Sequence, residues 1–250
     1  MKKSNKLLIV LCCFIIITLV FFNMLLNVQL KAGNFRNDFK DIPPVVVTLQ
    51  PFNHVVYDGR LYMSHSRTSQ SWTDRSMYLS IGEKEKYKLE MPSNITSLLK
   101  YSYQGDTLFI SFNEKGEKIG RRDYVPESGV PLHLFAPGLT SVSSLSGAII
   151  FSGIDQKGPL ALHLSQSMNF TLHSLHLPIL NLHIDTNAQV RIIDNSYVDS
   201  LALTMSKNTV LTINTPDNIK SLQPVQLDAS ARISMEGKAN DMKTYLQKTQ

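Results

Sequence analysis

Four of the seven histidines lie in one short segment, and histidine is the side chain best suited to bind a metal or transfer a proton near neutral pH. They are His163, His173, His176 and His183. His163 and His183 both stand between apolar residues, so on neighbouring strands they would share an outer face about 4.8 Å apart, close enough to bind one metal ion. Zinc needs three or four ligands, and the next equivalent position holds Thr204. We therefore predict no metal site and no cofactor, with His163 and His183 as the only candidate ligands.

Charged residues in the same region suggest a second chemistry. Some β-helical enzymes cleave acidic polysaccharides with carboxylate-bound Ca²⁺ and a basic residue that removes a proton. The residues of these types here are Asp185, Arg191, Asp194 and Asp199. Arg191 has only hydroxyl side chains at its equivalent positions, and no nucleophile elbow, phosphate loop or metalloprotease motif is present. The sequence predicts a protein that is not an enzyme.

These residues belong to a repeat of about twenty residues. Each unit has three apolar residues in alternation, a five-residue polar gap, and two more apolar residues. The offsets are 20, 21 and 22 residues, and 19 of the 20 template positions are apolar. Alternation predicts strands with one buried face, and a fixed period predicts units that bury that face only against their neighbours. The four units are Leu160–Leu172, Leu180–Ile192, Leu201–Ile213 and Gln223–Met235.

The gaps between the alternating runs predict polar corners. Asp185 and Asp228 open two of them, and Asn187 and Asn208 lie within two. Asn and Asp hydrogen-bond nearby backbone groups and tolerate left-handed conformations. A β-sandwich would also contain alternating strands, but not at a nearly constant period. We therefore predict an all-β chain of the β-solenoid class.

The N-terminus carries a long uncharged segment. Residues 7–30 contain no charge and follow Lys2, Lys3 and Lys6. As a helix this segment would be about 36 Å long, enough to cross a hydrocarbon core of about 30 Å. Basic residues before it favour a cytoplasmic N-terminus and an exported body. We predict one transmembrane helix acting as a signal anchor, with membrane residues including Leu7, Phe14, Phe22 and Leu30; a cleaved signal peptide is the alternative.

Charge and cysteine content narrow the range of partners. The net charge is +5, but three of these charges are the N-terminal lysines, and from residue 31 onward 22 Lys and Arg face 20 Asp and Glu. This nearly neutral body predicts no nucleic-acid partner. Both cysteines, Cys12 and Cys13, lie in the apolar segment, so the body has no disulfide, which fits a bacterial envelope protein.

The predicted organisation has four parts. Residues 1–30 form the anchor, and 31–41 form a juxtamembrane linker. Residues 42–237 form the exported domain, in which 42–125 supply an N-terminal cover and early strands and 126–237 supply the stacked repeats. A charged tail occupies 238–250.

Two passages resemble GIN-domain proteins, the autotransporter-adhesin-type head domains of Bacteroidetes. Leu98–Ser111, LLKYSYQGDTLFIS, is similar to the family's "v.gdtLvI" strand. Pro131–Leu139, PLHLFAPGL, followed by SVSSLSG at 141–147, resembles its "v.v.vp.l..l.vsGs" passage. The resemblance covers roughly residues 42–237. It implies a right-handed β-helix whose function is labelled adhesion by analogy, and it transfers no catalytic residue.

The functional prediction follows from these observations. We expect a non-catalytic, membrane-anchored binding or adhesion module of the bacterial cell envelope, facing the periplasm, or secreted or at the cell surface if the signal is cleaved. A self-associating scaffold is the alternative, and a polysaccharide-processing enzyme comes third. A glycan or an envelope protein is the expected ligand, and the sequence does not set the oligomeric state. The candidate binding residues are His163, His183, Arg191 and Thr204.

Overall fold

The computed structural model describes residues 14–15, 18–25, 28, 43–64, 70–112, 132–164, 168–193 and 195–236. The chain divides into two compact units, Met1–Asp41 and Ile42–Gln250. The second unit is all-β. Its described strands are β1 (Pro44–Thr48), β2 (His54–Asp58), β3 (Arg60–Ser64), β4 (Gln70–Asp74), β5 (Met77–Gly82), β6 (Lys88–Pro92), β7 (Leu99–Gln104), β8 (Thr107–Phe112), β9 (Leu132–Ala136), β10 (Ser141–Ser146), β11 (Ile149–Asp155), β12 (Leu160–Leu164), β13 (Asn169–Ile184), β14 (Gln189–Ile192), β15 (Tyr197–Met205), β16 (Val210–Ile213), β17 (Ile219–Leu227) and β18 (Arg232–Met235). Two short 3-10 turns, η1 (Ser93–Ile95) and η2 (Pro216–Asn218), complete the list.

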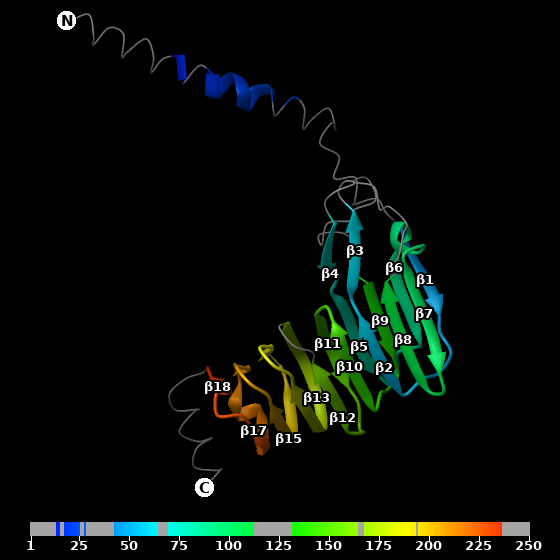
Figure 1. Ribbon diagram of the computed structural model, residues 1–250, viewed down its shortest axis with the longest axis vertical. Coiled ribbons are helices and arrows are strands. Elements are labelled where there is room, and N and C mark those ends of the chain that lie inside the picture. The colour runs from blue at the N-terminus through cyan, green and yellow to red at the C-terminus, as the bar shows by residue number, and fades with distance from the viewer. Residues whose placement is uncertain are drawn as a thin grey trace, which may run out of the picture. The chain divides into compact units, whose positions relative to one another are not determined.

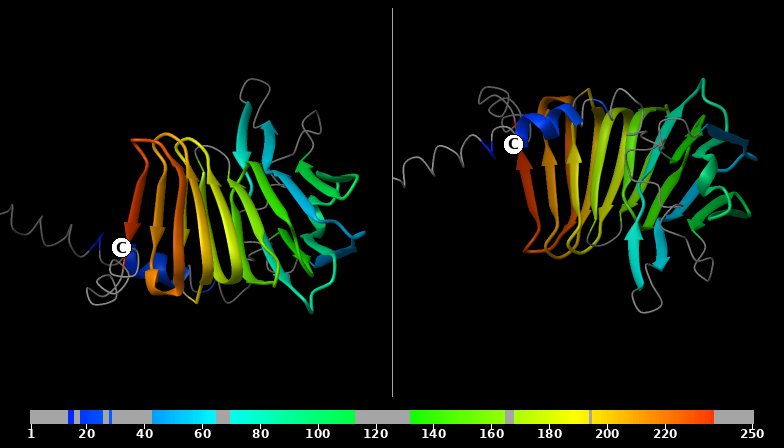
Figure 2. Two further views of the ribbon diagram at one scale, coloured as in Figure 1. Left: turned by 90° about the horizontal axis from the view of Figure 1, so that it is seen from below. Right: turned by 90° about the horizontal axis from the view of Figure 1, so that it is seen from above.

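Sixteen of these strands form one sheet, and β3 and β4 form a separate hairpin (Figure 1). The order along the main path is β1-β6-β9-β5-β11-β13-β12-β10-β2-β8-β7, and β14 to β18 join it through β13. The pairs β1–β6, β6–β9 and β7–β8 are antiparallel, whereas the pairs between the repeats are parallel. The sheet is therefore mixed, and it curls on itself as the two views of Figure 2 show.

The repeat spacing correctly predicts which strands pair. Leu160 lies beside Leu180, and Leu180 lies beside Leu201, in parallel ladders that follow the offsets of 20 and 21 residues. The second strands of the units follow the same rule, since β14 pairs with the first part of β13 and with β16. Stacking of this kind places chemically equivalent side chains one above another.

The predicted right-handed β-helix, or β-solenoid, is wrong. The structure shows one curled, half-barrel-like sheet of mixed strands, with antiparallel pairs in its N-terminal part. In addition, β13 runs for 16 residues through two successive units, with one left-handed residue at Ser174 in place of a polar corner. A period in sequence specifies the neighbour of each strand, but it carries no information about how the whole sheet curves or closes.

The fourth unit departs from its predicted register. Leu201 pairs with Leu222 rather than with Gln223, and the register shifts between Leu203 and Thr204. The cause is Pro224, which lacks an N–H and is accommodated in sheets at edges and bulges. Val225 is consequently left out of the ladder and is 70% exposed, although the template predicted it to be buried.

The interior is a stack of mostly aliphatic side chains. Leu160, Leu180 and Leu201 are fully buried, as are Leu172 and Leu211 in the facing strands. Complete burial of one such side chain contributes about 1.5–3 kcal/mol relative to exposure. Because each inward position repeats on the next strand, the outward positions are fixed as well, and these carry the polar side chains considered below.

The corners contain the predicted asparagines in left-handed conformations. Asn187 and Asn208 have φ values of 59° and 56°. The Asn208 Nδ2 donates a hydrogen bond of 3.2 Å to Asn187 Oδ1, so the two amides form a ladder between neighbouring corners. Asp185 accepts a 2.8 Å hydrogen bond from the Thr186 N–H, which is a local turn contact.

A buried glutamine, Gln156, joins the loop after β9 to the loop before β12 through hydrogen bonds to the backbone. Gln156 Oε1 accepts a hydrogen bond from the Leu139 N–H at 2.9 Å, and its Nε2 donates to the Leu139 carbonyl at 2.9 Å. The same Nε2 lies 3.2 Å from the carbonyl oxygens of Gly158 and Pro159. The buried Gln156 side chain therefore has both ends of its amide satisfied, as buried polar groups generally require.

The predicted transmembrane helix and signal anchor are not found. The described residues of the first unit are helical, but among them no helix is long and apolar enough to cross a membrane. Phe14 and Phe22 are 67% and 65% exposed. Leu7, Leu30, the linker 31–41 and the tail 238–250 lie outside the described residues.

Gly147 supports a close approach of three segments, which gives the first prediction. Its φ is +77°, and an added Cβ would collide with the carbonyl oxygen of Arg75 and lie 2.9 Å from Gly59 Cα. We expect Gly147→Ala to lower the free energy of unfolding by about 2 kcal/mol or more, since left-handed strain and overpacking each cost about 1–3 kcal/mol. Urea unfolding followed by circular dichroism measures this.

Gly105→Ala is the matched control. Gly105 has a φ of +62° in the turn between β7 and β8, but no atom lies within 4 Å of an added Cβ. It should therefore show the cost of the left-handed conformation without the collision. Equal losses of stability in the two variants would contradict the close approach at Gly147.

Candidate functional site: the histidine face

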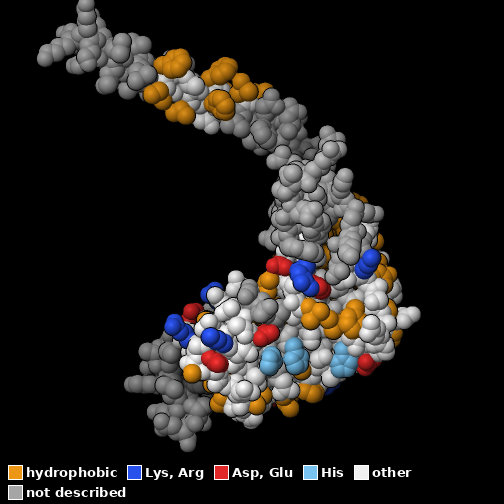
Figure 3. Space-filling model, in the orientation of Figure 1, with side chains coloured by type: hydrophobic (Ala, Val, Ile, Leu, Met, Phe, Trp, Pro, Cys, Tyr) orange, Lys and Arg blue, Asp and Glu red, His pale blue; other side chains and the backbone are white. Residues whose placement is uncertain are grey.

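The candidate site lies on the outward side of the parallel ladder that runs from β2 to β15. We call it the histidine face and define it by two rows of side chains in register. One row is His54, Ser141, Ala161, Asn181 and Ala202, and the other is Ser143, His163, His183 and Thr204. Figure 3 shows histidine side chains in a line over the region of β2, β12 and β13, with few charged side chains between them.

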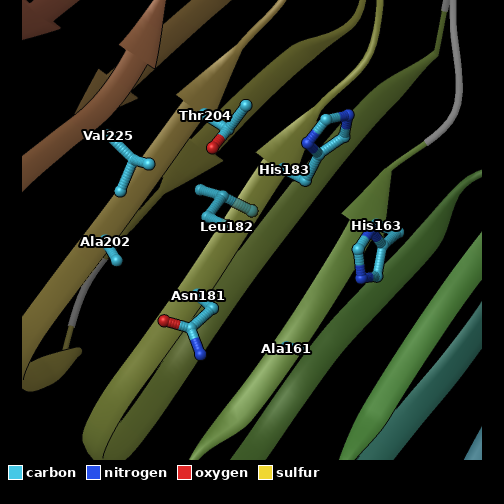
Figure 4. A pocket seen from close by; sticks show the side chains of 8 residues that line it. All are labelled: Ala161, His163, Asn181, Leu182, His183, Ala202, Thr204 and Val225. Carbon is cyan, nitrogen blue, oxygen red and sulfur yellow. The ribbon is translucent and has the colours of Figure 1, made fainter.

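A shallow depression of about 180 Å³ lies in the middle of this face. Ala161 and Ala202 stand on either side of Asn181, and their small side chains leave the space beside the amide open. His163, His183 and Thr204 form one rim, and the exposed side chain of Val225 supplies apolar surface, whereas the Leu182 side chain is buried (Figure 4). The depression is smaller than the roughly 300–1,000 Å³ of typical small-molecule pockets, so it can hold only part of a ligand.

The two histidines of the rim lie in ring contact. His163 and His183 are register partners on β12 and β13, and their ring centroids are 5.6 Å apart at an interplanar angle of 36°. Burial, and after it the neighbouring His183, lower the pKa of His163 below its ordinary value. Near neutral pH the His163 ring is therefore uncharged, with one nitrogen able to donate and the other able to accept.

Asn181 and Thr204 complete the polar part of the site. Within the described part of the chain, neither side chain makes a hydrogen bond or ion pair. Asn181 is exposed and Thr204 is half-buried, so water serves both groups in the free protein. The depression thus offers amide, imidazole and hydroxyl groups that a ligand can use without breaking a contact inside the protein.

A second polar cluster, at the start of β2 and β10, contains serine, histidine and aspartate. His54 Nδ1 lies 2.7 Å from Ser141 Oγ, and His54 Nε2 lies 3.5 Å from Asp106 Oδ2. The residue types match a hydrolase triad, so nucleophilic catalysis has to be considered.

The geometry of this cluster does not support catalysis. The 3.5 Å separation exceeds an ordinary hydrogen bond, so Asp106 does not orient the ring. The N–H groups of Thr140 and Ser141 both donate to the Asn53 carbonyl, so they are not available to stabilise an oxyanion near the serine. We interpret the cluster as a clamp that holds the β7–β8 turn against β2 and β10.

The other predicted binding residue, Arg191, and the acidic residues considered for polysaccharide cleavage lie at separate places in the structure. Arg191 lies on β14, in a row with Thr171 and Thr212, away from the ladder that carries His163 and His183. Asp199 forms a 2.6 Å ion pair with Lys220, and Asp185 serves its corner. Asp194 lies outside the described residues. These groups do not converge on one cleft.

The remaining histidines of the cluster have other contacts. His176 stacks on Tyr197 with ring centroids 5.2 Å apart, and His173 Nδ1 lies 2.7 Å from Ser174 Oγ. No group of three or more histidine, cysteine or acidic side chains that could hold a metal is found among the described residues.

The sequence correctly predicted that His163 and His183 lie side by side, but it did not identify Asn181 as the centre of a depression. The signal available in the sequence was the pair of alanines at equivalent positions on each side of it.

Comparisons with known proteins do not assign a family. No family model matches the chain, and no curated protein matches it. The GIN-domain resemblance is therefore not confirmed.

Solved structures with a similar arrangement of strands come from Bacteroidetes. A "putative adhesin" from Bacteroides fragilis is 12% identical, covers 78% of this chain and 93% of its own, and has a TM-score of 0.44. A "putative adhesin" from Parabacteroides distasonis is 11% identical, covers 78% and 79%, and has a TM-score of 0.42. A "putative lipid binding protein" from Parabacteroides distasonis is 9% identical, covers 78% and 94%, and has a TM-score of 0.34. At this level of similarity their names assign no function to this chain, and the argument below uses only the histidine face.

The histidine pair gives a prediction about pH. Since the pKa of folded His163 lies below the value of about 6.5 expected in the unfolded chain, the unfolded chain takes up the proton first. The folded state should therefore lose stability as the pH falls below about 6.5, and the effect should be absent at pH 8. NMR titration of the histidine ring protons and thermal unfolding between pH 5 and 8 measure these effects.

His183→Asn should move the pKa of His163 back toward its ordinary value, because it removes one of the two causes and leaves burial. His176→Asn is the control and should not move it, because His176 contacts Tyr197 instead. A His163 that titrates at or above 6.5 in the unmodified protein would contradict the prediction.

Proposed function

We propose that this protein is a non-catalytic binding module and that the histidine face binds an extended, uncharged or weakly charged polar chain, with a glycan as the best fit. The observation that carries the proposal is the depression around Asn181, where polar groups without internal partners stand beside apolar surface. Sugar residues present the same combination, with hydroxyl groups at their edges and C–H groups on their faces.

The chemistry of the depression matches such a ligand in three respects. The Asn181 amide and the Thr204 hydroxyl can each donate and accept, as a sugar hydroxyl requires. The exposed side chain of Val225 offers apolar contact beside them. No Lys, Arg, Asp or Glu lines the depression, which favours a neutral ligand over a phosphate or an acidic peptide.

The shape of the face favours a chain over a single small molecule. The depression is shallow, so one bound sugar residue would gain little affinity from it. Strands about 4.8 Å apart repeat along the face, and Ser143 on β10 continues the polar row beside His163. A polymer that crosses several strands adds contacts at each one, so affinity should increase with chain length. We place this binding at the cell envelope or surface, in line with the exported body that the sequence favours.

Filling the depression gives a direct test. Ala202→Trp places a large ring beside Asn181 without removing a polar group, and we expect it to weaken binding to a glycan polymer by about tenfold or more, which corresponds to about 1.4 kcal/mol. The full-length protein is first applied to an array of glycans and envelope polysaccharides, and the best binder is then titrated by calorimetry.

Thr212→Trp is the matched control, because Thr212 is an outward position of β16 in the row of Arg191 and outside the depression. It should bind as the unmodified protein does. If no polysaccharide binds, or if Ala202→Trp and Thr212→Trp bind equally well, the proposed site is excluded.

A self-associating scaffold is the second candidate, and the C-terminal end of the sheet supports it. Within the described residues, β17 pairs only with β15 and β18 pairs only with β16, so both leave one edge open. Leu227 is 44% exposed, whereas its register partner Met205 is buried. Open edges of this kind can pair with another chain.

Two features of the same edge oppose association, so the scaffold ranks second. Pro224 removes one backbone N–H donor from β17, and Lys220 places a charge on the same strand, as is common at edges protected against pairing.

Sedimentation velocity over a range of concentrations separates the two candidates. The scaffold requires a mass that rises with concentration and a return to monomer in Leu227→Lys, with Lys207→Ala as an exposed control on the β15–β16 turn. A constant monomeric mass excludes the scaffold.

A further inference from the structure

We infer that His163 and His183 form a two-histidine site for a divalent transition-metal ion such as Zn²⁺, Ni²⁺ or Cu²⁺. The sequence alone predicted no metal site, because only two imidazoles fall at equivalent positions and zinc usually takes three or four protein ligands. The inference departs from that prediction by leaving the remaining coordination positions to water. It also goes beyond the proposed function, since it can be tested without any glycan.

The separation of the rings fits one shared ion. A metal bound at 2.0–2.1 Å from a ring nitrogen lies about 3.2 Å from the ring centroid. Two rings on one ion would therefore have centroids about 5.2 Å apart at a tetrahedral angle and at most about 6.4 Å apart when they are opposite. The observed 5.6 Å lies between these limits. The rings come from register partners on adjacent strands, so the backbone ladder holds their spacing.

The rings are also free to act as ligands. Unlike His54, His133 and His173, which contact serine hydroxyls, His163 and His183 have no hydrogen-bond partner within the described part of the chain. Imidazole nitrogens are common metal ligands, and both rings border the depression on the outer side of the sheet. No bond inside the protein has to be broken before an ion binds.

The surroundings determine which ion is preferred. The depression contains no carboxylate, and Ca²⁺ and Mg²⁺ require oxygen ligands of that kind. Imidazole suits Zn²⁺, Ni²⁺ and Cu²⁺. Two protein ligands leave coordination positions open to water or to an oxygen atom of a bound molecule. The Asn181 amide and the Thr204 hydroxyl border the same depression and can hydrogen-bond water held on the ion.

The test uses the full-length protein without a histidine tag. Calorimetric titration with Zn²⁺ at pH 7.5 should show one ion per chain, and Ca²⁺ should show no binding. His163→Asn and His183→Asn should each weaken Zn²⁺ binding by at least the roughly 10–100-fold that the loss of a supporting group causes. His176→Asn is the matched control and should bind Zn²⁺ as the unmodified protein does, since His176 is also an exposed histidine of β13.

A second measurement shows whether a variant has simply lost its fold. Zn²⁺ should raise the thermal midpoint of the unmodified protein and of His176→Asn but not those of His163→Asn and His183→Asn, while all four share one midpoint without metal. The site is excluded if Zn²⁺ does not bind, if binding survives either substitution at the pair, or if it is lost in His176→Asn. Glycan binding without Zn²⁺ binding would remove this inference and leave the proposed function intact.

Discussion

The structure depends on one contact repeated along the chain, in which an inward apolar side chain packs on the equivalent side chain of the next parallel strand. Leu160, Leu180 and Leu201 form one such column, and all three are fully buried. Since side chains alternate along a strand, a slip of one residue would exchange the buried and exposed faces of the whole strand. The column therefore fixes the register of the sheet, and the register determines which side chains meet on the outside.

The sequence was informative wherever this contact recurs and uninformative elsewhere. The offsets of 20 and 21 residues identified the partners of β12, β13 and β15, because each offset is the length of chain between two buried positions of one column. They failed at β17, where Pro224 introduces a shift that an alternating template cannot contain. The closure of the sheet could not be predicted, because the antiparallel pairs β1–β6 and β7–β8 join segments without the repeat. For the same reason the β-helix that the period suggested does not describe the whole unit.

The candidate site was harder to predict than the strand pairing, because it consists of outward-facing residues that core packing does not constrain. The inward residues are constrained by packing, whereas Ala161, Asn181 and Ala202 face outward and contribute little to the core. Placing His163 and His183 together needed only the repeat. The depression needed more, because Val225 lines it only as a result of the irregularity at Pro224. A departure from the repeat thus helped to shape the depression on the histidine face.

The polar groups of this protein fall into two kinds, and the difference between them supports binding over catalysis. Gln156 is buried and has both ends of its amide hydrogen-bonded, and Ser141 and His54 hold each other beside a turn. These groups stabilise the fold and have no free capacity for a reaction. Asn181 instead stands at the surface without an internal partner, where water satisfies it. A ligand that replaces this water gains hydrogen bonds at a small cost, because little protein structure has to rearrange. Catalysis would further require donors aimed at a developing charge, and the backbone N–H groups nearest Ser141 are already committed to the Asn53 carbonyl. A ladder that presents polar groups without internal partners on its outer face is therefore suited to hold a ligand in place.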